Sequence, residues 1–235
     1  MRTILVACAL CLVAFAPASA EDAPRKRIAA ITTVYNHNSH ADVIISRLFQ
    51  TDTLDGKGRQ PNLKLVSLYV DQTPENDISR KFSREYGFPI YDTVRETLTC
   101  GGERLAVDGV LLVAEHGQYP KSDTGQTVYP KRRLFEQVVQ VFRESGRVVP
   151  VFIDKHFADN WTDAKWIYDQ CRELHIPVMA GSSLPTTWRD PPVDVSPDKP
   201  LSEILILSYH TLDAYGFHGL EAAQALAEQR QGGET

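Results

Sequence analysis

Side chains that can transfer protons follow four hydrophobic segments of this sequence, each at the point where the segment ends. Imidazoles, carboxylates and ammonium groups of this kind act as general acids and bases, and several of them also bind metal ions. Lys155 is the sharpest candidate, because an ammonium placed directly after a hydrophobic segment is partly removed from water and can act on a hydroxyl or carbonyl. The candidates are His37 and His40 after the first segment, Asp71 after the second, Glu115 and His116 after the third, and Asp154, Lys155 and His156 after the fourth.

Strand-like and helix-like segments alternate along the chain and must position these side chains. Continuous hydrophobic runs rich in β-branched residues predict buried strands, and apolar residues at helical spacing predict the helices between them. This alternation is typical of a doubly wound α/β domain with a parallel, Rossmann-like sheet. The expected strands are 28–34, 63–70, 107–114, 148–153 and 176–180, and the expected helices are 41–49, 75–86, 132–144 and 162–174.

The ends of parallel strands meet at one edge of a sheet, and ligands of open α/β sheets bind outside that edge. We therefore expect His37, Asp71, His116 and Lys155 to face one cleft. Asp71 is either a ligand-binding acid or a turn residue before Thr73 and Pro74, and the sequence leaves both readings open.

The first twenty residues have the pattern of a secretory signal peptide, which would be cleaved from the mature protein. Arg2 is followed by the apolar run Ile4–Ala16 and by the small residues Ala18–Ala20. This run is shorter than the roughly 20 residues that a membrane-spanning helix needs. We expect a secreted or periplasmic protein without a membrane span.

The charge and composition of the chain argue against nucleic acid as a partner. Its 235 residues carry a formal charge of −5, and no stripe of Lys and Arg offers a surface for nucleic acid. Small molecules or other proteins are the expected partners. Outside the signal peptide only Cys100 and Cys171 remain, which either pair or stay as two small buried thiols, and they form no disulfide framework.

A Pro-rich stretch over 189–200 separates the domain 27–190 from a short C-terminal segment, 200–235. This segment predicts a strand at 202–209 and a helix at 213–229, too little to bury a core of its own. Leu212, Tyr215 and Leu220 belong to an apolar helix face that must pack on the main domain, on another chain or on residues beyond Thr235. We expect the start of a truncated α+β domain, through which the protein can also oligomerise.

The run Val107–Val113, the histidine His116 and the sequence Asp154–His156 together resemble the N-terminal domain of the Gfo/Idh/MocA oxidoreductases. The similarity extends weakly to Tyr215–Glu221. It implies an NAD(P)-binding Rossmann-like domain followed by a domain that holds a sugar or polyol. It also implies catalytic roles for Lys155 and His218, a cofactor site with Asn36, Asp71 and His116, and a substrate site with His37, His40 and His156.

The chain departs from that family in its first turn. The family uses glycines there, because only glycine lets backbone amides approach a diphosphate closely, whereas Thr32–Asn38 contains none. We therefore predict weak or absent binding of NAD and NADP. Three functions stay open: an oxidoreductase acting on a sugar-like alcohol, a cofactor-free protein that binds carbohydrate, and a metal-dependent enzyme. The candidate metal ligands are His37, His40, His116, Asp154 and His156.

Overall fold

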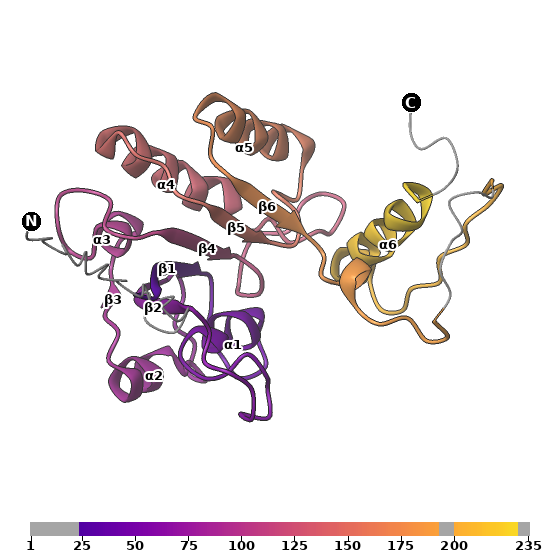
Figure 1. Cartoon of the computed structure of the whole chain (residues 1–235). Coiled ribbons are helices and arrows are strands. Elements are labelled where there is room, and N and C mark those ends of the chain that lie inside the picture. Colours follow the sequence, from indigo (N-terminus) through magenta and orange to yellow (C-terminus); the bar gives the residue numbers. More distant parts are fainter. Residues whose placement is uncertain (1–23, 193–199, 230–235) are drawn as a thin grey trace, which may run out of the picture.

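The computed structural model describes residues 24–192 and 200–229 (Figure 1). The expected signal peptide lies outside them. A single six-stranded sheet runs in the order β3-β2-β1-β4-β5-β6, and every neighbouring pair is parallel. The strands are β1 (Lys26–Thr32), β2 (Leu63–Val70), β3 (Ile90–Tyr91), β4 (Gly109–Val113), β5 (Val151–Asp154) and β6 (Val178–Gly181).

Helices cover both faces of this sheet (Figure 1). One face packs on side chains of α1 and α2 and includes Ala41, Ile45 and Phe88, whereas the other packs on α3, α4 and α5 and includes Phe135 and Ile167. The predicted doubly wound α/β fold is therefore confirmed. The helices are α1 (His40–Ile45), α2 (Ser79–Tyr86), α3 (Val94–Thr99), α4 (Lys131–Ser145), α5 (Trp161–Glu173) and α6 (Phe217–Ala227), with a 3-10 turn at Ser46–Leu48.

Strand order reverses between β1 and β4, which pair with each other while the chain continues outward on both sides. The carboxyl ends of these two strands are fixed to each other by side chains. Thr32 Oγ1 donates to the carbonyl of Val113 at 2.9 Å, and Thr33 Oγ1 donates to the carbonyl of Glu115 at 2.6 Å. All four residues are buried, so the edge where ligands bind in such folds is held rigidly.

Helix α3 was not expected from the sequence. Its six residues are too few to show helical periodicity, but Thr93 caps it: Thr93 Oγ1 accepts from the Glu96 amide at 3.1 Å and donates to Glu96 Oε2 at 2.9 Å. The spacing of Thr93 and Glu96 was the available signal.

The expected strand at 202–209 is wrong. The structure has irregular extended chain there, with no ladder to any described strand, because the nearest sheet ends at β6. Leu205, Leu207 and Tyr209 are consequently exposed. The predicted helix forms as a π-turn at Leu212–Gly216 followed by α6, which packs beside Leu184–Thr186.

Within the described ranges, no helix is both long enough and apolar enough to cross a bilayer. Cys100 and Cys171 are free thiols, and Cys171 is buried.

Replacement of Phe135 should show that α4 anchors one half of the core. Phe135 is fully buried, so Phe135→Ala is expected to lower the free energy of unfolding by about 3–5 kcal/mol. Gln140→Ala, at an exposed position of the same helix, should change it by less than about 0.5 kcal/mol. Urea denaturation measures both, and equal losses would contradict this view of the core.

Candidate functional site

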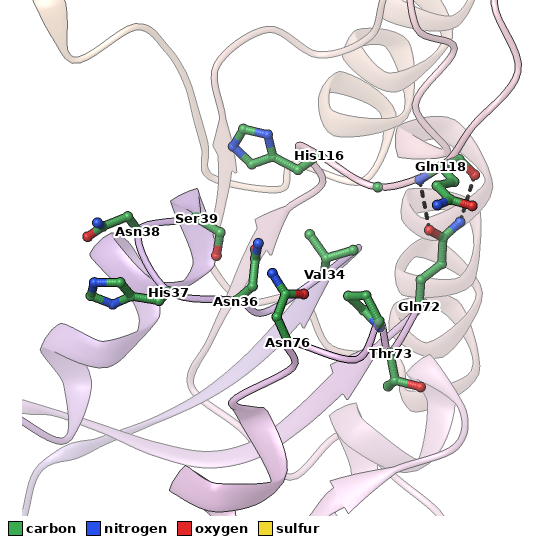
Figure 2. A pocket seen from close by; sticks show the side chains of 12 residues that line it. Val34, Asn36, His37, Asn38, Ser39, Gln72, Thr73, Asn76, His116 and Gln118 are labelled. Atoms are coloured by element: carbon green, nitrogen blue, oxygen red, sulfur yellow. Dashed lines mark hydrogen bonds between the residues drawn. The ribbon is translucent and has the colours of Figure 1, made fainter.

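A cleft of about 570 Å³ lies at the carboxyl ends of β1, β2 and β4 (Figure 2). Its walls come from the loops that leave these three strands, at the place where strand order reverses. Two hydrogen bonds of 2.9 Å, between the Gln72 amide group and the backbone of Gln118, hold two of the walls together. The lining residues are Val34, Asn36, His37, Asn38, Ser39, Gln72, Thr73, Pro74, Asn76, His116, Gly117 and Gln118.

No lysine, arginine, aspartate or glutamate is among the described residues that line this cleft. Amides, hydroxyls and imidazoles supply its polar groups instead. Asn36 Oδ1 is buried and accepts no hydrogen bond from any described group. A buried acceptor of this kind is costly unless a ligand or water donates to it.

The turn after β1 is closed by a carboxylate of the chain itself. Ser39 begins α1 by accepting from the Asp42 amide at 3.3 Å. Asp42 in turn accepts from the Asn38 amide and from Ser46 Oγ, each at 2.9 Å, and its Oδ2 lies 3.3 Å from His37 Nδ1. In the turn where a diphosphate would approach, the Asn38 amide therefore already donates to a negatively charged side chain.

Asp71 has three protein donors on its carboxylate. Tyr69 Oη donates at 2.6 Å, Tyr119 Oη at 2.7 Å and Arg133 Nη2 at 2.7 Å. Burial alone would raise the pKa of Asp71, but these donors hold it below its ordinary value. The carboxylate ties β2 to α4 and does not line the cleft.

Two lysines share one buried carboxylate behind the cleft. Glu115 lies two residues beyond the end of β4. Its Oε1 is 2.6 Å from Lys131 Nζ, and its Oε2 is 3.3 Å from Lys155 Nζ. Lys131 is fully buried and Lys155 nearly so. Burial would raise the pKa of Glu115, but the two ammonium groups hold it below its ordinary value, whereas burial lowers the pKa of Lys131.

Lys131 also fixes the backbone on either side of Lys155. Its ammonium donates to the carbonyl of Asp154 at 3.1 Å and to that of His156 at 3.0 Å. Lys155 itself adopts a left-handed backbone with φ of 60°, and His116 does so with φ of 67°. Such conformations are uncommon for residues with a side chain and persist where neighbouring contacts impose them, often at functional sites.

His40 and Asp154 form a second close pair. His40 Nδ1 lies 2.5 Å from Asp154 Oδ2, and the His40 ring meets the His116 ring edge to face at 5.0 Å. His116 lines both the cleft and a smaller polar pocket of about 110 Å³, to which Glu115 and Lys155 also contribute. The cleft and the charged cluster are thus contiguous at His116.

Three imidazoles of this region are held uncharged near neutral pH. Burial, with the positive charge of Lys131, lowers the pKa of His156 to about 4. Burial also lowers the pKa of His116, with a contribution from His40, and that of His218, with a contribution from Lys155. His218 reaches the site from α6, where its Nδ1 lies 2.5 Å from Ser182 Oγ.

The structure brings most of the residues singled out from the sequence to one edge of the sheet, but the single cleft expected for four of them is wrong: His37 and His116 line it, whereas Asp71 and Lys155 are held by ion pairs outside it. Their assigned roles stay predictions. Asn36, His37 and His116 line the cleft, and His116, Lys155 and His156 line the smaller pocket. Among the described residues, no group of three or more His, Cys, Asp or Glu side chains is arranged to hold a metal ion.

Sequence reasoning missed Lys131, Asp42 and Ser182. Lys131 had a signal: a cation in the first turn of a helix opposes the helix dipole and needs a specific partner. Asp42 had one as well, because it follows the capping residue Ser39 by three positions. Ser182 had none, since it meets His218 only through the fold.

No family model matches the chain, and no curated protein is similar to it in sequence. Solved structures do resemble it. A Gfo/Idh/MocA family oxidoreductase from Vibrio cholerae is 18% identical over 68% of this chain and 39% of its own, with a TM-score of 0.42. Myo-inositol 2-dehydrogenase from Lactobacillus plantarum is 12% identical over 68% of this chain and 37% of its own, with a TM-score of 0.43.

Biliverdin reductase from Synechocystis, solved with biliverdin and NADP+, is 14% identical over 88% of this chain and 57% of its own, with a TM-score of 0.44. The chain spans less than two fifths of the inositol dehydrogenase and over half of the biliverdin reductase. These neighbours include Gfo/Idh/MocA oxidoreductases, the family that the sequence motifs resemble.

Proposed function

We propose that the protein binds an uncharged, sugar-like molecule in the cleft at the ends of β1, β2 and β4, and that the adjoining Lys155 transfers protons to it. The observation that carries this proposal is the lining of the cleft, which is rich in amides and hydroxyls and free of charged side chains among the described residues. Such groups match the alternating donors and acceptors of a polyol, and they supply no counter-charge for an anion.

The residues present do not fit the diphosphate of a nicotinamide dinucleotide. The first turn lacks glycine, the Asp42 carboxylate already accepts from its backbone, and no cation faces the cleft from the described residues. Asp71, which stands where a ribose-binding acid belongs, is bonded to three protein donors. The proton transfer proposed for Lys155 needs no nicotinamide.

Proton transfer needs groups that are held in place and differ in charge. Lys155 supplies an ammonium whose counter-ion, Glu115, is fixed by Lys131. His116 and His218 supply uncharged imidazoles, because burial lowers their pKa. An ammonium beside neutral imidazoles provides both an acid and a base for a hydroxyl or carbonyl of the ligand.

A second candidate is the oxidoreductase, with NAD or NADP, Lys155 as acid or base and His218 assisting. It is favoured by one observation, the position of the cleft where the order of the parallel strands reverses. We further propose that the protein works outside the cytoplasm, because residues 1–20 have the pattern of a signal peptide.

Calorimetry with uncharged and anionic sugars tests the preference of the cleft. D-glucose and myo-inositol should bind more tightly than D-glucuronate and D-glucose 6-phosphate, because no cation among the described residues lines the cleft to compensate an added negative charge. Asn36→Ala should weaken binding of the neutral sugars about 10-fold, since it removes a buried acceptor. Asn62→Ala, at an exposed position outside the cleft, is the matched control. Tighter binding of either anion would overturn the proposal.

Dinucleotide binding separates the two candidate functions. NAD and NADP, titrated to millimolar concentration in the same calorimeter, should show no micromolar affinity, because the turn after β1 has no glycine and its Asn38 amide already donates to Asp42. Micromolar affinity for either would favour the oxidoreductase instead.

The uncharged imidazoles also predict how stability depends on pH. The unfolded chain takes up protons at histidine near pH 6.5, whereas His156 in the folded protein does so only near 4, so stability falls as the pH drops through this range. His156→Asn should reduce the fall between pH 6.5 and 5 by about 1 kcal/mol, measured by urea denaturation. The exposed His175→Asn should leave it unchanged. Equal slopes in wild type and His156→Asn would contradict the buried, neutral state.

A further inference from the structure

The pair formed by His40 and Asp154 has the geometry of a carboxylate-oriented base. Asp154 ends β5, and only about 10% of its side chain is exposed, whereas His40 begins α1 and its side chain is about 30% exposed. Their Nδ1–Oδ2 distance is 2.5 Å. An ionised carboxylate can only accept, so Nδ1 carries a proton, and in the neutral form of the ring Nε2 is the nitrogen with the free electron pair.

Such an arrangement strengthens an imidazole as a base. The carboxylate fixes the orientation of the ring and stabilises the positive charge that forms when Nε2 takes up a proton. Asp154 precedes Lys155 in the chain, and Lys131 holds the Asp154 carbonyl at 3.1 Å. The base and the ammonium are therefore positioned by the same short segment.

The base also lies beside the ligand-binding cavities. The His40 ring contacts the ring of His116, which lines both the cleft and the smaller pocket. Lys155 lines that smaller pocket, and His218 from α6 interacts electrostatically with both His40 and Lys155. His40 itself is not among the residues that line either cavity, so a ligand reaches it by extending from the cleft past His116.

We propose that His40 is the general base of this site and removes a proton from the carbon next to the carbonyl of a hydroxycarbonyl sugar. This rests on the proposed function and names its reaction class, an isomerisation that needs no redox cofactor. His40 Nε2 takes the proton, and the electrons of the broken C–H bond form the double bond of an enediol. The carbonyl oxygen accepts a proton from the Lys155 ammonium.

The reverse transfer completes the cycle. Protonated His40 returns a proton to the former carbonyl carbon. The hydroxyl on the carbon that first lost its hydrogen gives its proton to Lys155, and the new carbonyl forms at that carbon. Substrate and product are isomers, so no oxidant or reductant is consumed. Asp154 is a positioning residue in this scheme, because it acts only through His40.

Exchange of carbon-bound hydrogen with solvent tests this step directly. The full chain is incubated in D₂O with dihydroxyacetone and, separately, with D-fructose, and deuterium at the carbon next to the carbonyl is followed by NMR. Wild type should exchange both faster than buffer. His40→Asn, whose side-chain amide still donates to Asp154, should slow exchange roughly 10²–10⁴-fold. Asp154→Asn should slow it less, because Nε2 remains. The exposed His175→Asn should exchange like wild type.

Calorimetry with the same sugars separates the two proposals. Sugars that bind but do not exchange overturn the role of His40 and leave the binding cleft in place. Exchange that is lost in His40→Asn without measurable sugar affinity supports His40 and counts against the cleft. Wild type that exchanges neither sugar above buffer, or His40→Asn that exchanges both at the wild-type rate, overturns the assignment of His40.

Discussion

The buried carboxylate of Glu115 is the interaction on which the functional edge of the sheet depends. It lies between Lys131 and Lys155, and it compensates two ammonium groups that have lost most of their contact with water. Removing one partner of such a cluster leaves a buried charge without compensation, which typically destabilises a protein by about 3–5 kcal/mol. Lys131 adds bonds to the carbonyls on both sides of Lys155, so the loops after β4 and β5 keep one conformation.

The charges of this cluster balance one another, so the cluster adds no net charge beside the neighbouring cleft. Glu115 and Asp154 together offset Lys131 and Lys155, and the imidazoles of His116 and His156 stay neutral because they are buried beside positive charge. No net charge is left over to attract an ion into the cleft. The recognition proposed for the cleft rests on hydrogen bonds from amides and hydroxyls, which discriminate by the position of donors and acceptors rather than by the sign of a charge.

The sequence was sufficient for five of the six strands of the sheet and for the edge at which the site lies, whereas the two-residue strand β3 is too short to leave a pattern. Apolar runs and helical spacing report which side chains are buried, and β2 begins and ends where the pattern placed it. The sequence did not predict which distant residues pair with each other. Lys131 with Glu115, His40 with Asp154 and Ser182 with His218 depend on which loops the strand order brings together, and a single sequence carries no record of that order. The strand expected at 202–209 failed for the same reason, because local propensity does not supply a neighbouring strand.

The C-terminal segment contributes less to the chemistry than its sequence suggested. Glu115, Lys131, Asp154 and His40 all belong to the domain that precedes the Pro-rich stretch, so the charged cluster and the His40–Asp154 pair form without α6. From the segment come Phe217, whose ring meets His156 edge to face, and His218. The charged cluster and the His40–Asp154 pair therefore lie entirely in the part of the chain before the Pro-rich stretch, and the segment adds one imidazole and one aromatic contact to them. Changes in the segment should therefore act on His218 and on the ring contact to His156 before they act on the ion pairs of Glu115, which are fixed by residues outside it.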